Sequence, residues 1–429
     1  MNDKSVYFKK LSLRGWRQFD SIDIDLHPRM TILAGANGSG KSTLLNIFSQ
    51  HFGWGLPYLA TPRQTRTGGY TYFSGLNYMA LKAIVAPSSN IEIGHIIYST
   101  EHKTPLLLQN TQSVEYKIIT GAKPDVYGFH IPSHRLAPTY KAVEQVSLQP
   151  MLPDVAYDKF ANEVMTRYRG KWSHESPMYR MKEAIISMAT FGPGSRYIRR
   201  DESILECFEG FIGVLRNTLP ESLGFLDLSI RTPDIVLVTK SGEFMLDAAS
   251  GGLLALIDLA WQIHMFSFSH KSAVITIDEP ENHLHPSMQR TVLGNLIRAF
   301  PNNQFIVATH SPFIVSAVQD SAVYALQYFD AESQSPAKEQ EIRLERSVRS
   351  VKLDSFSRSG NAAEILRDVL GVKVTIPGWV EDRLKGIIEN YKNREFDSET
   401  LTSLRGELSE LGFSDLFPDV VAEILPHHD

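Results

Sequence analysis

A glycine-rich segment near the start of the chain has the pattern of a phosphate-binding loop. Residues 35–42, Gly-Ala-Asn-Gly-Ser-Gly-Lys-Ser, fit G-x-x-x-x-G-K-[ST] at every position, between a strand-like apolar run and a helical apolar pattern. Backbone N–H groups of such a loop and of the following helix can surround a triphosphate. We expect Lys41 to reach the β- and γ-phosphates and Ser42 to ligate Mg²⁺. The nucleotide-binding residues expected in this phosphate loop are Asn37, Gly38, Ser39, Gly40, Lys41, Ser42 and Thr43.

Two acidic residues and one histidine follow two other apolar, strand-like runs. Asp278 and Glu279 end the run at 273–277, and His310 comes just after the run at 304–308. Ligands of parallel α/β sheets bind at the carboxyl ends of the strands, so these side chains are expected beside the phosphate loop. Asp278 is suited to hold Mg²⁺, Glu279 to polarise the attacking water, and His310 to contact the γ-phosphate or that water. The expected catalytic residues are therefore Glu279 and His310.

A third short motif precedes the most apolar helical segment of the chain. Ser250, Gly251 and Gly252, here called the signature loop, come directly before an apolar run that begins at Leu253. Serine and paired glycines at a helix N-terminus can bind a second phosphate. The same three residues can also serve as a simple helix cap, so both interpretations stay open from the residues alone.

The remaining sequence predicts the elements that would position these motifs. Strands are expected at 6–13, 21–26, 79–85, 91–99, 105–109, 114–120, 126–131, 226–230, 235–239, 244–246, 273–277 and 304–308, and strands at 322–328 and 341–346 are expected to cover a sheet edge. Helices are expected within 154–218 and at 253–268, 286–299, 312–319, 361–370, 378–392, 398–411 and 416–425, with a long loop at 52–75. We expect four parts: an ATPase lobe with the phosphate loop (1–150), a helical insertion (151–225), the rest of the motif-bearing head (226–350) and an acidic helical subdomain (351–429).

Composition limits the class of protein and its compartment. The 429 residues are 43% hydrophobic, include one cysteine and carry a net charge of −5. No apolar run approaches about 20 residues and no leader pattern is present, so we expect a cytoplasmic protein without a membrane span. The charge argues mildly against a nucleic-acid binder, although a local basic patch remains compatible with it. Residues 360–429 hold seven basic and fourteen acidic residues, which suggests either a solvated helical cap or a partner surface.

The order of these motifs resembles the ABC-type ATPase heads of the SMC, RecF and OLD branch. The segments that carry the resemblance are Gly35–Thr43, Asp278–Pro286 and Ala308–Pro312, and Ile131-Pro-Ser-His-Arg135 is also similar. The resemblance implies an α/β head, with a mixed sheet flanked by helices, a helical insertion and a C-terminal helical subdomain. It also implies an ATPase that converts ATP and water to ADP and phosphate. Ser133, His134 and Arg135 occupy the place where this class usually has a glutamine.

The same resemblance implies how subunits would assemble. Two copies would bind head to tail around two ATP molecules, with Ser250, Gly251 and Gly252 of one copy on the γ-phosphate held by Lys41 of the other. Asn282 and His283 fall where the family has a loop that crosses between subunits. Gly251 and Gly252 are followed by Leu253 and Leu254 instead of the usual glutamine. This difference leaves open in detail how the two copies would close around ATP.

The segment Asp278–Pro286 is characteristic of OLD-like bacterial defence ATPases, including those of the Septu, PARIS and retron-associated systems. No clustered acids of a Toprim nuclease follow residue 320. We therefore expect an ATPase subunit, a homodimer or higher homo-oligomer, that controls a separately encoded effector such as a nuclease in anti-phage defence. The alternative is a RecF-like repair ATPase that contacts DNA itself. A transporter motor is disfavoured, because Glu281-Asn-His-Leu-His-Pro286 is not the segment usual in that class.

Overall fold

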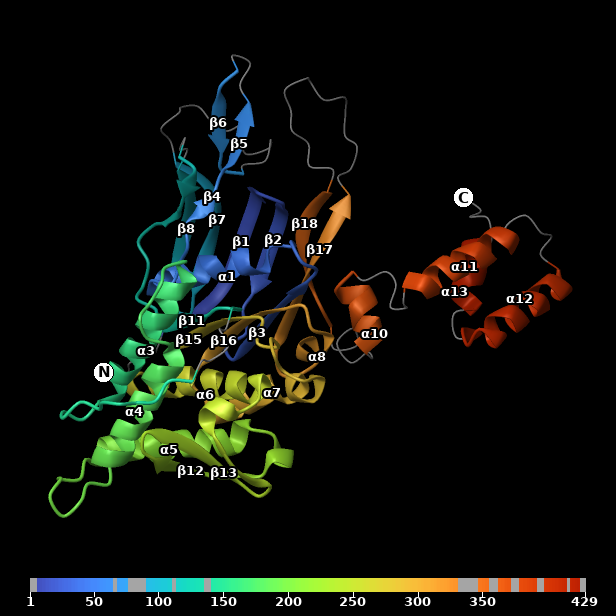
Figure 1. Cartoon of the computed structure of the whole chain (residues 1–429). Helices are drawn as coiled ribbons and strands as arrows, with labels where there is room; N and C mark the ends of the chain where they lie inside the picture. The colour runs from blue at the N-terminus through green and yellow to red at the C-terminus, as the bar shows by residue number, and fades with distance from the viewer. Residues whose placement is uncertain are drawn as a thin grey trace. The chain divides into compact units, whose positions relative to one another are not determined.

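The structure is a computed structural model that divides into two compact units, Met1–Gly371 and Val372–Asp429. Figure 1 shows the course of the chain through both units. The residues that the structure describes are 6–64, 68–75, 90–109, 113–134, 140–330, 346–354, 362–371, 378–391, 397–414 and 417–424. The expected strand at 79–85 and residue Arg135 lie outside the described residues.

The first unit is built around a mixed sheet with eleven strands among the described residues, in the order β10-β8-β7-β1-β2-β18-β17-β3-β16-β15-β11. One side of it is antiparallel: β10 (Ile118–Thr120), β8 (Lys103–Gln109), β7 (Asn90–Tyr98), β1 (Phe8–Trp16) and β2 (Phe19–Asp25). The other side is parallel: β17 (Ala322–Asp330), β3 (Met30–Gly35), β16 (Gln304–Thr309), β15 (Val274–Asp278) and β11 (Gly128–Ile131). This arrangement confirms the expected mixed sheet of an α/β head.

The expectation that two late strands cover a sheet edge is wrong. β17 pairs with β3 in parallel and with β18 (Arg346–Lys352) antiparallel, while β18 also pairs with β2. Both strands therefore lie in the middle of the sheet, where they join its parallel and antiparallel sides. The expected strand at 341–346 lies mostly outside the described residues, and β18 begins at its last residue. The loop expected at 52–75 also needs correction, because it contains the β5 (Thr61–Gln64) and β6 (Tyr70–Phe73) hairpin.

The parallel strands show why the predicted motifs meet. Every residue of β3, β15 and β16 is buried, as expected for strands covered on both faces, whose sequences read as continuous apolar runs. Because the strands are parallel neighbours, with β16 between β3 and β15, their carboxyl ends share one edge. The phosphate loop, Asp278 and His310 follow those three ends.

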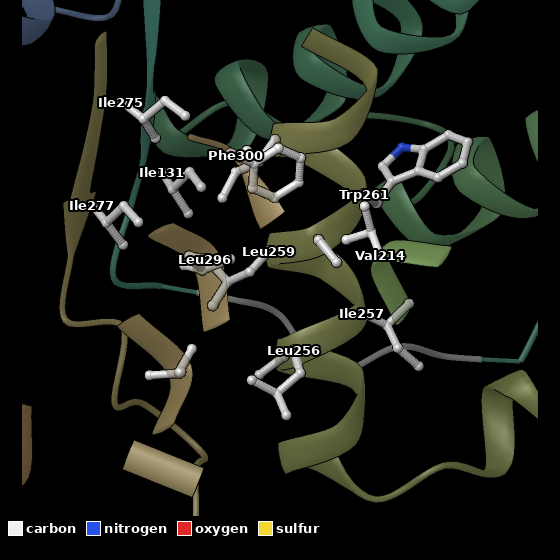
Figure 2. Close-up of a cluster of buried hydrophobic side chains, with 14 of the residues drawn as sticks. Ile131, Val214, Leu256, Ile257, Leu259, Trp261, Ile275, Ile277, Leu296 and Phe300 are labelled. Carbon is white, nitrogen blue, oxygen red and sulfur yellow. The ribbon is translucent and has the colours of Figure 1, made fainter. Parts of the chain in front are cut away.

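Helices cover one face of the parallel strands and form the largest core. These are α3 (Pro153–Tyr168), α4 (Pro177–Phe191), α5 (Glu202–Thr218), α6 (Gly251–Ser269) and α7 (Pro286–Ala299). Figure 2 shows side chains of α5, α6 and α7 meeting those of β11 and β15 in this layer. α6 is long and apolar enough to span a membrane by length and composition, but 72% of its apolar window is buried inside the protein. It is a core helix, apolar on all sides because it is surrounded.

A smaller antiparallel sheet stands beside α5. It consists of β12 (Phe225–Arg231), β13 (Asp234–Thr239) and β14 (Gly242–Met245), close to the three strands expected there. The chain passes from β14 through the 3₁₀ turn η3 (Leu246–Ala248) into the signature loop and α6. The last strand of this small sheet is therefore connected to the start of α6 by η3 and the signature loop.

The acidic C-terminal segment splits between the two units. Ile365, Val369 and Leu370, from the π-helical turn η4 (Ile365–Val369) and its end, are buried in the core of the first unit. α11 (Gly378–Tyr391), α12 (Ser398–Glu410) and α13 (Phe417–Ile424) instead enclose a core of their own, which includes Leu384 and Ile387. These apolar residues of the tail are thus covered inside the chain.

Candidate nucleotide-binding site

The phosphate loop joins β3 to α1 (Lys41–Ser49), the context that the motif requires. Gly38 and Gly40 have φ angles of 81° and 99°, in the left-handed region that favours glycine. A Cβ at Gly40 would also collide with the ring of Phe19. Gln18, in the turn between β1 and β2, donates from Nε2 to the Gly38 carbonyl at 3.3 Å. This β1–β2 turn supports the loop from one side, a contact that the sequence did not indicate.

The residues of the loop differ in what they expose. Asn37, Gly38 and Ser42 are exposed, and Gly40 and Thr43 are half-buried. Ser39 is fully buried and its hydroxyl has no hydrogen-bond partner. Its backbone N–H donates to the Ala36 carbonyl at 3.2 Å. Ser39 is therefore covered by the loop, whereas Ser42 is exposed and its hydroxyl lies beside Asp278.

Lys41 lies inside the loop that it is expected to complete. Its Nζ donates to the Gly35 carbonyl at 2.8 Å and to the Ala36 carbonyl at 3.1 Å. Burial lowers the pKa of the ammonium, and the charges of Asp278, Glu279 and Glu281 oppose that shift. The ammonium is thus held by two loop carbonyls and lies near three carboxylates. Phosphate oxygens that bind in the loop would find this cation already in position.

Asp278 ends β15 as a buried carboxylate that is short of partners. Its side chain hydrogen-bonds with the Ser42 hydroxyl, and its Oδ1 has no partner in the structure. Burial is the main reason that the pKa of Asp278 rises to about 6. An orphaned carboxylate oxygen beside a serine hydroxyl fits the oxygen ligands that Mg²⁺ prefers. Ser42 and Asp278 are therefore the residues that would hold the ion.

Glu279 stands next to Asp278 in an uncommon backbone conformation. Its φ is 50°, which a non-glycine residue adopts only when its surroundings fix it, often at functional sites. Asn282 donates from Nδ2 to Glu279 Oε2 at 2.9 Å, and His310 Nδ1 lies 3.3 Å from Oε1. Asn282 also donates to the Ser133 carbonyl at 3.1 Å. The structure therefore brings Glu279 and His310 together and gives Asn282 a role within its own subunit.

Glu281 is a site residue that the sequence interpretation overlooked. Its side chain is 5% exposed, and its Oε1 accepts from the Thr309 hydroxyl at 2.6 Å and from the His310 N–H at 3.0 Å. Its Oε2 has no hydrogen-bond partner. Glu281 thus ties the end of β16 to the segment after β15 and sets the position of His310. Its place two residues after Glu279 was the available signal.

The signature loop and the phosphate loop have different close neighbours in the chain. A Cβ at Gly252 would stand 2.9 Å from the His283 carbonyl and 3.6 Å from Met288 Sδ, and the nearest neighbour at Gly251 is His283. The neighbours found the same way for Gly35, Gly38 and Gly40 are Ser39, Leu326, Tyr328, Phe19 and Gln18. Ser250 precedes α6 without a side-chain cap bond, and Ser250 and Gly251 are exposed. The side chain of Ser250 is thus not used to cap α6 in this structure.

The segment after β11 contacts this site through its backbone. The Ser133 carbonyl accepts from Asn282, and the Ser133 hydroxyl lies 3.2 Å from His134 Nδ1. Ser133, one of the residues that stand where the family usually has glutamine, is therefore linked to Glu279 through the amide of Asn282.

Comparison with known proteins places this geometry in a family. The chain is 30% identical over 343 residues to the Septu protein PtuA of Bacillus thuringiensis, a match that covers 75% of this chain and 76% of that protein. The chain belongs to the PtuA family. Residues 10–118 match the family described as "AAA domain", and residues 170–316 match "AAA domain, putative AbiEii toxin, Type IV TA system". This PtuA-family chain therefore carries an ATPase domain, as the motifs predicted.

The chain is also similar to a retron ATPase in sequence and to an Smc head in structure. The "Retron Vc95 probable ATPase" of Vibrio cholerae serotype O1 biovar El Tor is 32% identical over 111 residues, which cover 23% of this chain and 22% of that protein. This chain thus matches only about a fifth of that relative. A Pyrococcus furiosus Smc head with an extended coiled coil, bound to the C-terminal domain of ScpA, is 16% identical with a TM-score of 0.41, covering 85% of this chain and 99% of that one. No residue role is transferred from that structure.

Proposed function

We propose that two copies of this chain bind and hydrolyse ATP at shared sites, and that this cycle controls a separate effector in cytoplasmic antiviral defence. The observation that carries the proposal is that Ser250 is exposed and unused as a cap of α6, while the signature loop and the phosphate loop have different close neighbours in the chain. His283 and Met288 neighbour the first, and Phe19 and Leu326 neighbour the second. A second copy, turned head to tail, would bring an exposed Ser250 to the phosphates held by Lys41.

The side chains at the strand ends suit hydrolysis. Lys41 would move from the loop carbonyls to the β- and γ-phosphates. Ser42 and Asp278 would hold Mg²⁺, which neutralises phosphate charge when bound. Glu279, oriented by Asn282 and His310, would accept the proton of the attacking water. Glu281 would keep His310 near the γ-phosphate by holding its backbone.

The effector is proposed from family membership. The related PtuA is named as a Septu protein and another relative as a retron ATPase, and the motifs of this chain resemble the defence ATPases of those systems. A nuclease supplied as a separate chain suits an ATPase head that carries no recognised nuclease motif beyond residue 320. Co-purification of this chain with the product of a neighbouring nuclease gene tests this part, and its failure would leave the ATPase proposal untouched.

The Glu279→Gln variant tests the shared ATP site. The amide keeps the shape of the side chain and cannot accept a proton, so turnover should fall by roughly 100- to 10,000-fold while ATP stays bound. With Mg²⁺ and ATP, light scattering should show the variant moving from 48.2 kDa to at least twice that mass. Glu101→Gln, at an exposed ion pair with Lys9, is the matched control and should hydrolyse ATP normally. Normal turnover by Glu279→Gln would show that another residue is the base.

A further inference from the structure

A buried lysine links the helical layer to the signature loop. Lys182 lies in the middle of α4, and its side chain is completely buried. Removing an ammonium from water costs several kcal/mol unless close partners compensate it. Its Nζ lies 2.7 Å from Asp247 Oδ2 and donates to the Lys141 carbonyl at 2.9 Å. The charge is therefore compensated by residues far from it in the chain.

Asp247 is the partner that connects this lysine to the ATP site. It lies in η3, three residues before Ser250, and its side chain is 5% exposed. In the signature loop that follows, a Cβ at Gly252 would stand 2.9 Å from the His283 carbonyl. The loop is thus held between the Lys182–Asp247 pair and the segment 279–283, which carries the expected base.

A second carboxylate gives the ammonium another partner. Asp234, at the start of β13, places Oδ1 3.6 Å from Lys182 Nζ, and the Tyr140 hydroxyl donates to its Oδ2 at 3.4 Å. Oδ1 of Asp234 and Oδ1 of Asp247 have no hydrogen-bond partner. One ammonium therefore serves two carboxylates on separate elements, and loss of Asp247 would leave the lysine paired with Asp234.

We propose that Lys182 is a positioning residue, which fixes the signature loop through Asp247 in the orientation needed by the ATP of a second copy. A buried ion pair is often no more stabilising than apolar residues of equal size, but it holds its partners at one distance and direction. The pair joins α4 to the last turn before Ser250, so a shift of α4 moves the loop directly. The contact of the signature loop with the ATP of a second copy rests on the proposed function, whereas the positioning of the loop by Lys182 does not.

Hydrogen exchange in the nucleotide-free full chain tests the positioning by itself. Lys182→Met should raise exchange of the amides in 246–254 by about tenfold, because Asp247 in this segment loses its ion pair with α4. Asp247→Asn should do the same, and it keeps Lys182 compensated by Asp234 if the first variant fails to fold. Lys159→Met is the matched control: it removes the pair between Lys159 and Glu183, the neighbour of Lys182 on α4. That control should leave 246–254 unchanged.

A kinetic measurement separates positioning from a general structural role. Lys182→Met and Asp247→Asn should bind ATP within about twofold of the parent chain, while kcat falls about tenfold because closure on a second copy is impaired. Unchanged exchange at 246–254 in either folded variant would overturn the proposal. If the two variants show increased exchange but the parent chain never hydrolyses ATP, the positioning role is upheld and the proposed function is refuted.

Discussion

The ends of β3, β15 and β16, here called the phosphate edge, and the signature loop are held in different ways. At the phosphate edge, side chains follow fully buried, hydrogen-bonded parallel strands. The signature loop instead stands at the free end of α6, next to an ion pair with α4 and the His283 carbonyl. The first region is fixed by the central sheet, and the second by contacts with α4 and with the segment that follows β15.

This difference separates two tasks that one ATPase must perform. A ligand-binding edge benefits from rigid geometry, because phosphate and ion contacts are set before the nucleotide arrives. On the proposed function, the signature loop meets a second copy and can move with the helices that carry it, since elements that move are drawn from the less firmly held parts of a fold. We therefore expect variants at the phosphate edge to affect a single chain, and variants at the signature loop to affect pairs of chains.

Breaking the phosphate edge should give the largest effect. Lys41→Ala removes the ammonium that faces the phosphates, and ATP affinity should fall on the order of 100-fold, the value of a lost charge-assisted contact. Titration with a fluorescent ATP analogue measures the change in a single chain. Lys9→Ala, which removes an exposed ion pair with Glu101, should bind the analogue normally. Equal affinities in the two folded variants would contradict the assignment of Lys41.

A bulky residue at the signature loop should spare the phosphate edge. Ser250→Arg fills an exposed position, so ATP binding by one chain should stay within about twofold, as for most surface substitutions. In the Glu279→Gln background, ATP-driven association should weaken about tenfold or more, because the arginine occupies the space of the partner's phosphates. Ser203→Arg, at an exposed position on α5, is the control and should associate normally. Intact association of Ser250→Arg, measured by sedimentation, would exclude the loop from the subunit contact.

The smallest expected effect concerns stability at the phosphate edge. Burial raises the pKa of Asp278 to about 6, so keeping this carboxylate ionised at pH 7 destabilises the fold without Mg²⁺. The shift corresponds to roughly 3 kcal/mol, but a buried asparagine amide also costs free energy. Asp278→Asn should therefore raise the free energy of unfolding at pH 7 by only about 1 kcal/mol in a nucleotide-free urea titration, while abolishing the Mg²⁺ dependence of ATP binding. Asp20→Asn, at an exposed pair with Arg349, should not stabilise the chain. A destabilised Asp278→Asn would show that the carboxylate has partners beyond Ser42.

The sequence was informative where the chemistry is local. Lys41 and Ser42 lie within one loop, and Asp278 and Glu279 end one strand, so short motifs were sufficient to place them on a shared sheet edge. Glu281 was overlooked because its partners, Thr309 and His310, lie 28 and 29 residues further along the chain.

Long-range pairing could not be predicted from local patterns. β18 pairs with β2 across more than 300 residues, and no periodicity in either strand indicates that neighbour. Lys182 and Asp247 are separated by 65 residues, and an isolated lysine in a helical pattern is ordinarily read as a surface residue. The sequence predicted helices in the tail, but their spacing could not show that the first part joins the core of the first unit while the later helices enclose a core of their own.

The central claim, that each ATP site is shared between two copies, is tested most directly by mixing two inactive variants. Lys41→Ala lacks the phosphate loop cation and Ser250→Arg lacks a working signature loop, so each alone should hydrolyse almost no ATP. A mixed pair contains one intact site, formed by Lys41 of one chain and Ser250 of the other. An equal mixture should recover about a quarter of the parent activity, since half of randomly formed symmetric pairs are mixed and each has one working site. No recovery, from variants that mix freely, would contradict the account.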